Sequence, residues 1–183
     1  PYFYGEHESP EQLGSIDSLH PRVRSKPPIH SPLTQGQISV LGIGDTGVTL
    51  VSGSKATGLD RVGETLRALS KLEGARPFVL IEAKGSIERS MKQVERAISR
   101  DKKDRPDSPQ GVVVLSPLQG DTASLASQVQ ATITTVGKHP TRRGSWLLFV
   151  FLVDPVALGN WIALDKMKRE EIESRVSFFA LKR

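Results

Sequence analysis

Two glycines at the end of an apolar stretch are the first residues whose spacing suggests chemistry. In the stretch VTLVSGSKATGLDRVGETL, Gly53 and Gly58 stand five positions apart, between a strand-like run and an amphipathic, helix-like run. Glycines at this spacing let backbone N–H groups surround a phosphate at the start of a helix. The loop, with Ser54, Lys55 and Thr57 between the glycines, is therefore a candidate site for the phosphates of a nucleotide.

Two positions just after this loop differ from a working phosphate loop, G-x-x-x-x-G-K-[ST]. Leu59 stands where the Lys should contact the phosphates, and Asp60 stands where a hydroxyl should bind magnesium. Losing a charge-assisted contact costs about 1.5–3 kcal/mol. A carboxylate beside a phosphate adds repulsion of about 4 kcal/mol at an effective dielectric near 20. We therefore expect no bound cofactor, or at most weak, vestigial ATP binding through the backbone amides and Lys55.

A second candidate site follows the apolar stretch FVLIE. Glu82 and Lys84 form an E-x-K pair at the end of this stretch, Gln93 follows on the next helix, and Asp60 could supply an upstream acid. This set resembles the PD-(D/E)xK nucleases, in which the acids hold magnesium and the Lys assists water or phosphate. The family places its first acid on a strand paired with the E-x-K strand, whereas here a helix is expected between Asp60 and Glu82. The simpler interpretation is that Glu82 and Lys84 are solvated.

The elements that must position these residues alternate along the chain. Apolar, β-branched runs predict strands, and apolar residues at helical spacing predict helices between them. From residue 37 the stretch ISVLGIGDTGVTLVSG suggests two strands around a Gly-Asp-Thr-Gly turn. The later strands are expected at 78–83, 111–117, 146–154 and 175–182. The helices are expected at about 59–71, from Ser86 to about Ile98, from Asp121 to about Val136 and at 155–164, with a further turn at 169–174 and a polar loop at 101–109.

This order predicts the α/β class: a three-layer, doubly wound, mostly parallel five-stranded sheet. On the loop spacing and this topology, the chain resembles the P-loop NTPase fold of the AAA and STAND (signal-transduction ATPase) type. The resemblance implies an acid at the end of the third strand, where Ser116 stands instead, and places Asp154 near the sensor position after the fourth. Leu59, Asp60 and Ser116 together therefore suggest a pseudo-ATPase. A plain tight turn in another α/β fold stays an alternative.

Composition limits the other function classes. The chain has 183 residues, no cysteine and a net charge of +5, and its His residues lack metal-ligand spacing. The absence of cysteine fits a cytoplasmic protein, and no apolar run is long enough for a membrane span. The positive charge suits nucleic acid, but no basic stripe with interleaved aromatics supports that partner. Residues 1–36, with four prolines in HPRVRSKPPIHSPLTQG, are expected to form an extended arm or linker, and residues 37–183 the domain.

We therefore expect an inactive, ATPase-like scaffold or regulatory domain. The chain does not begin with Met, so we expect a piece of a longer protein, and the partner is another protein or the rest of that chain. The STAND resemblance implies a bacterial signalling or defence assembly. Two alternatives stay open: a magnesium-dependent nuclease, and a weak nucleotide binder that needs a residue from a partner chain.

Overall fold

The computed structural model describes residues 41–71, 78–84, 86–104, 111–138 and 145–181. Its centre is a five-stranded sheet in the order β2-β3-β4-β1-β5, in which every pair of neighbours is parallel. The strands are β1 (Gly47–Ser52), β2 (Phe78–Glu82), β3 (Gly111–Pro117), β4 (Trp146–Val153) and β5 (Ser177–Ala180). The helices are α4 (Val62–Leu69), α5 (Ile87–Asp104), α6 (Thr122–Lys138), α7 (Pro155–Ile162) and α8 (Lys166–Glu173).

The apolar strands at the centre of the sheet are buried on both faces. In β4, the run WLLFVFLV is buried at every position except Leu152, which is half-buried. In β3 the first five residues are buried as well. Such continuous β-branched and aromatic runs are typical of parallel strands covered by helices on both sides. The two faces carry separate core clusters, one built around Phe149 and Val114 and the other around Leu148 and Val113.

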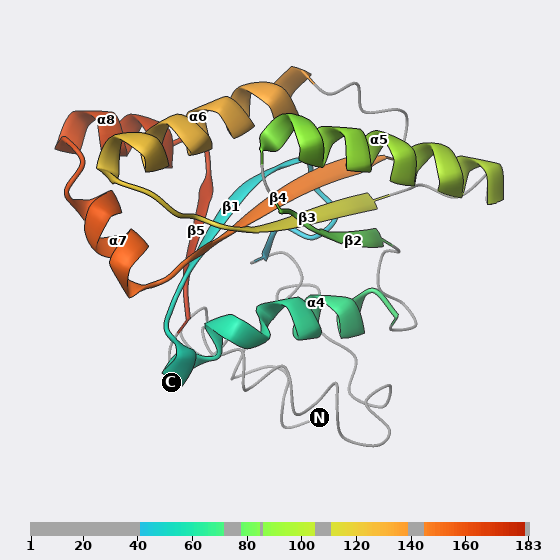
Figure 1. Ribbon diagram of the computed structural model, residues 1–183, viewed down its shortest axis with the longest axis horizontal. Coiled ribbons are helices and arrows are strands. Elements are labelled where there is room, and N and C mark those ends of the chain that lie inside the picture. The colour runs from blue at the N-terminus through green and yellow to red at the C-terminus, as the bar shows by residue number, and fades with distance from the viewer. Residues whose placement is uncertain (1–40, 72–77, 85, 105–110, 139–144, 182–183) are drawn as a thin grey trace.

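The helices form a layer on each side of this sheet. Figure 1 shows α4 on one face and α5 and α6 on the other, with α7 and α8 packed beside α6. Two sequence-predicted caps are confirmed: Ser86 Oγ accepts a hydrogen bond from Arg89 N at 3.3 Å, and Asp121 Oδ1 accepts one from Ser124 N at 2.8 Å. These side chains satisfy amide groups that the first turn of a helix leaves unpaired.

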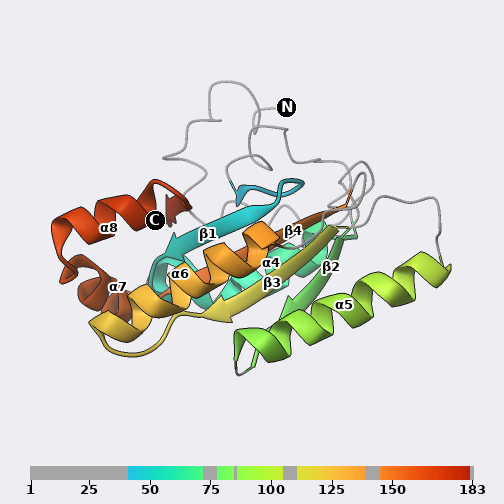
Figure 2. The same ribbon diagram turned by 90° about the horizontal axis from the view of Figure 1, so that it is seen from above.

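The path of the chain places a switch point beside β1. The connections from β2 to β3, β3 to β4 and β4 to β5 all run in one direction across the sheet, so right-handed crossovers put their helices on one face. The connection from β1 to β2 runs in the opposite direction, which puts α4 on the other face (Figure 2). β1 and β4 are neighbours in the sheet, and the loops that follow them therefore lead to opposite faces of the sheet. In doubly wound sheets, ligands bind in the crevice at such a point.

The α/β class and the five strands expected from the sequence are confirmed, with one refinement and two corrections. The sheet is entirely parallel rather than mostly parallel. The strand expected before the Gly-Asp-Thr-Gly turn is wrong in its described part, because Leu41 is helical and residues 42–45 form turns. The loop expected from residue 101 is also wrong at its start, because α5 continues to Asp104. The predicted arm at 1–36 lies outside the described residues.

Within the described ranges, no helix has the length and apolar character needed to cross a membrane.

Gly111 is required where β3 begins beside β4. A methyl group at this position would overlap the indole ring atoms of Trp146, a buried residue that also packs on Phe78 at a centroid distance of 5.9 Å. We expect Gly111→Ala to lower the free energy of unfolding by about 2–3 kcal/mol, because overpacking a core forces the ring to move. Gly159→Ala, in an open helical position of α7, is the control and should raise it by about 0.5–1 kcal/mol. Chemical denaturation measures both, and equal effects would contradict the proposed clash.

Candidate functional site

The Gly53–Gly58 loop lies where the sequence predicts it, between β1 and the first turns before α4, at the switch point of the sheet. The backbone N–H of Gly53 donates to the carbonyl oxygen of Val153 at 3.1 Å, which fixes the loop against the end of β4. A Cβ on Gly53 would lie 2.7 Å from Thr57 Oγ1 and 3.0 Å from Leu181 Cδ1. The absence of a side chain at Gly53 therefore serves the close packing of the loop.

The loop uses its own amides to close on itself. Residues Lys55–Thr57 form a 3-10 turn, termed η3, and Ser54 N donates to Thr57 Oγ1 at 2.8 Å. Thr57 N and Leu59 N both donate to the carbonyl oxygen of Ser54, at 3.1 and 3.0 Å, and Gly58 N donates to that of Lys55 at 3.2 Å. Gly58 permits this closure through its positive φ of 87°. A phosphate in the loop would have to replace several of these hydrogen bonds.

Leu59 and Asp60, the two residues that depart from the phosphate-loop pattern, differ in their exposure to solvent. Leu59 is 8% exposed and packs in the core cluster beneath α4, so it serves the core rather than the loop surface. Asp60 follows it in the short turn η4 (Leu59–Arg61) and is exposed, as is Lys55. The side chain of a Lys at position 59 would begin in the core, because Leu59 is buried there. Leu59 is therefore part of the packing of the domain.

Ser116 and Asp154 hold different positions relative to this loop. Ser116 is half-buried near the end of β3 and its side chain opens on the face covered by α5 and α6. Asp154 lies at the end of β4, and its carboxylate accepts a hydrogen bond from Ala157 N at 2.8 Å. Together with Pro155 at the first helical position, this makes Asp154 the N-cap of α7. Asp154 therefore caps α7, and it directly follows the residue whose carbonyl oxygen accepts from Gly53 N.

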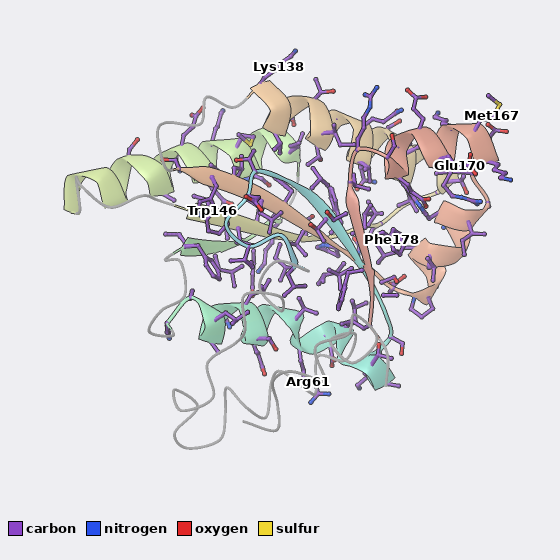
Figure 3. All side chains as sticks on the ribbon, turned by 180° about the vertical axis from the view of Figure 1, so that it is seen from behind. Arg61, Lys138, Trp146, Met167, Glu170 and Phe178 are labelled. Carbon is purple, nitrogen blue, oxygen red and sulfur yellow. The ribbon has the colours of Figure 1, made fainter. Side chains whose placement is uncertain are left out.

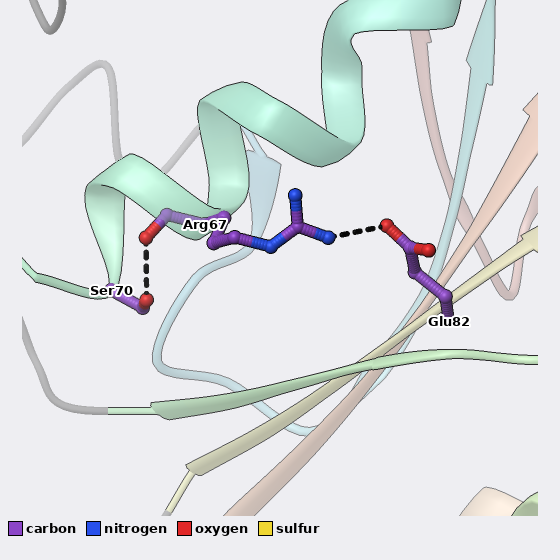
Figure 4. Close-up of polar contacts among 3 residues, drawn as sticks. All are labelled: Arg67, Ser70 and Glu82. Carbon is purple, nitrogen blue, oxygen red and sulfur yellow. Dashed lines mark hydrogen bonds and ion pairs between the residues drawn. The ribbon is translucent and has the colours of Figure 1, made fainter.

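The residues of the nuclease hypothesis are only partly brought together. Glu82 ends β2 and forms an ion pair with Arg67 of α4 at 2.7 Å (Figure 4). A Cβ on Gly63 would lie 3.2 Å from Glu82 Oε1, so this carboxylate lies over the start of α4, in the same part of the fold as Asp60. Gln93 is an exposed residue of α5, on the opposite face of the sheet. Lys84 is exposed beyond the end of β2.

This arrangement gives little support to a metal centre. Glu82 already has a cationic partner, and one surface ion pair of this kind contributes on the order of 0–1 kcal/mol to stability. The described part of the chain contains no group of three or more His, Cys, Asp or Glu residues suited to a metal ion. The four His residues lie at positions outside the described ranges.

A cavity on the other face of the sheet was missed by the analysis of the sequence. It has a volume of about 430 Å³ and lies between α5 and α6, with Phe149 and Phe151 of β4 and Ser116 of β3 at its floor. The available signal was the row of small residues on the facing sides of the two helices, Ser86 and Ser90 on one and Ser127 and Ala131 on the other. Helical spacing alone shows that such residues lie on one face of a helix, but it does not give the distance between two helices.

Comparison with models of known protein families finds none that matches the chain, and comparison with curated proteins finds no similar sequence.

The burial of Leu59 gives a direct test of the loop. We expect Leu59→Lys, which introduces the residue type of a working phosphate loop, to lower the free energy of unfolding by about 2 kcal/mol, because it removes buried apolar surface. Asp60→Ser, which introduces the hydroxyl of that pattern, is the matched control at an exposed position and should change stability by less than about 0.5 kcal/mol. Urea denaturation measures both. A neutral Leu59→Lys would show that this position is free to serve a ligand.

Proposed function

We propose that the domain is a catalytically inactive, P-loop ATPase-like scaffold or regulatory interaction domain of a larger assembly. The observation that carries this proposal is the closure of the Gly53–Gly58 loop by its own hydrogen bonds, with Leu59 in the core. The loop keeps the position that a nucleotide site would take at the switch point of a parallel sheet. The backbone N–H groups of the loop instead form hydrogen bonds within the domain.

The signalling or defence context of the assembly rests on the resemblance to STAND-type ATPases, which the sequence suggests through the loop spacing and the order of elements. The all-parallel sheet, with β1 between β4 and β5, is compatible with that resemblance and supports it at the level of topology. The partner is another protein or a further part of a longer chain.

The surface of α7 and α8 supports an interaction role. Val156 is 74% exposed, Ile162 is 58% exposed and Met167 is 80% exposed. Figure 3 shows Met167 pointing away from the domain at the outer end of α8, near charged residues such as Glu170. Single exposed apolar residues are ordinary, but three on two consecutive short helices are more than this background, and exposed apolar surface with a charged rim is typical of protein contact surfaces. We therefore place the contact with the partner protein on this helical pair.

The nuclease and the partner-assisted nucleotide binder remain weaker alternatives. The ion pair of Glu82 with Arg67 and the position of Gln93 on the opposite layer both weigh against a metal-dependent nuclease. A nucleotide binder would need the loop to open and a cation such as Lys55 to turn toward the phosphates. In the described residues, the contacts of Lys55 are the backbone hydrogen bonds of η3, and none of them turns its side chain toward the loop.

A thermal-shift titration with ATP, ADP and GTP, with and without magnesium, tests the closed loop. We expect the melting temperature to change by less than about 2 °C at 1 mM nucleotide. A dissociation constant above about 1 mM gives less than roughly 0.4 kcal/mol of stabilisation. A shift of several degrees that disappears in Gly58→Val would mean that the loop opens and binds phosphate. A shift with magnesium alone that disappears in Glu82→Ala would instead favour the nuclease.

Photo-cross-linking tests the contact surface on α7 and α8. A photo-reactive amino acid at Met167 should cross-link to one defined protein, or to one defined further segment of the same chain, in cells that produce the whole assembly. The same amino acid at Lys138, exposed at the far end of α6 (Figure 3), is the control and should give no such product. Mass spectrometry identifies the product. Equal cross-linking from both positions, or none from Met167, would contradict the assignment of this surface.

A further inference from the structure

The cavity between α5 and α6 has the size and the walls of a small-molecule site. Its volume of about 430 Å³ lies within the range of roughly 300–1,000 Å³ that is usual for ligand pockets. One wall comes from the first turn of α5 with Ser86 and Ser90, and the other from the middle of α6 with Ser127 and Thr132. The two helices lie over the same face of the sheet, as Figure 2 shows.

The floor of the cavity favours a flat ring. Phe149 and Phe151 form it, with their ring centroids 6.1 Å apart and their planes tilted by 38°. Both rings are almost fully shielded from solvent, at 2% and 4% exposed, so they give the cavity an apolar, aromatic floor of small accessible area. A planar aromatic ring gains from contact with such aromatic side chains.

The polar groups of the cavity favour a ligand that donates hydrogen bonds. The buried hydroxyls of Ser90 and Thr132 donate to carbonyl oxygens of their own helices, at 3.2 and 2.7 Å. Each hydroxyl oxygen therefore keeps lone pairs that accept a hydrogen bond from outside. The hydroxyl of Ser116 makes no hydrogen bond with any residue that the structure describes. A ligand with an N–H or O–H group would satisfy one of these oxygens.

The charge of the cavity excludes anions as its preferred ligands. Among the lining residues in the described part of the chain, Glu88 is the one ionisable group, and none of them is a Lys, Arg or His. A phosphate or carboxylate would lose its hydration without gaining a cationic partner. We propose that the cavity between α5 and α6 is a binding site for an uncharged, planar ring compound that carries an N–H or O–H donor.

This site is independent of the Gly53–Gly58 loop. The loop follows β1 and meets α4, whereas the cavity lies over β3 and β4 on the face of α5 and α6. The proposal therefore stands whether or not the domain has lost nucleotide binding. In an interaction domain, such a site would let a small neutral metabolite stabilise the domain.

The test is an NMR titration of the ¹⁵N-labelled protein with indole, 1-methylindole and indole-3-carboxylate. Indole should bind with a dissociation constant on the order of 1 mM, as expected for a ligand of this size, and should shift the amide signals of residues 86–90, 127–132 and 149–151. Indole-3-carboxylate, the matched anion, should bind at least about tenfold more weakly. 1-Methylindole, which lacks the donor, should bind about threefold to tenfold more weakly than indole.

Variants of the cavity separate this site from general surface binding. Ala131→Phe places a ring in the cavity from an exposed position of α6 and should weaken indole binding at least about tenfold, and Ser127→Phe is a second variant of the same wall. Ala163→Phe, at an exposed position after α7, is the matched control and should bind indole like the parent protein. Unchanged binding in both cavity variants, or shifts outside the named residues, would overturn the proposal.

The donor requirement has its own set of variants. At least one of Thr132→Val, Ser90→Ala and Ser116→Ala should weaken the binding of indole about threefold while leaving that of 1-methylindole unchanged. If all three variants bind indole like the parent protein, or if the carboxylate binds as tightly as indole, the assigned ligand class is wrong.

Discussion

The burial of β4 on both faces is the constraint on which the rest of the domain depends. A strand of eight apolar residues has no face that tolerates water, so helices must cover it from both sides and other strands must pair with both of its edges. β3 and β1 occupy those edges, and right-handed crossovers then decide which helix covers which face. Because β1 lies beyond β4, its connection to β2 returns in the opposite direction. That return produces the switch point at which the Gly53–Gly58 loop lies.

The same glycines that a phosphate loop needs are used here to close the loop. Small residues give backbone amides freedom to face a ligand, but they also let those amides bond within a short turn. In this chain Thr57 decides between the two outcomes, because its hydroxyl accepts from Ser54 N and donates to the carbonyl oxygen of Ser54. A buried Leu59 then holds the following turn against the core. Each of these bonds is worth only about 1 kcal/mol, but a ligand must replace several at once.

Much of the fold follows from the sequence because the strands are long, apolar and separated by amphipathic helices. Local rules also place the caps, since Ser86 and Asp121 act within three residues of their partners. The failures concern features that local rules do not settle. The sequence around Leu41 resembles a strand, but Leu41 itself is helical, and the charged residues at the end of α5 resemble a loop but continue the helix. In both places the residue types permit either structure.

The position of the candidate site was predictable from the sequence, but whether its loop is open or closed by hydrogen bonds was only partly predictable. Glycine spacing located the loop, and the order of elements placed it between a strand and a helix, yet the closed hydrogen-bond pattern depends on the conformation of Ser54 and Thr57. The side of the sheet that Ser116 faces follows from strand alternation, because Val112 and Val114 point to the same core cluster. That Ser116 lines a cavity does not follow from the sequence, because the cavity depends on the distance between α5 and α6.

The distance between α5 and α6 has a physical cause in their facing side chains. Where α6 meets the sheet and the helices beside it, Leu125 and Val129 fill the space and are fully buried. Toward α5 the same helix presents Ser127 and Ala131, which are too short to reach the serines of the other wall. Close packing is the usual state where side chains of sufficient size meet. The small residues therefore keep open a space that larger apolar side chains at the same positions would fill.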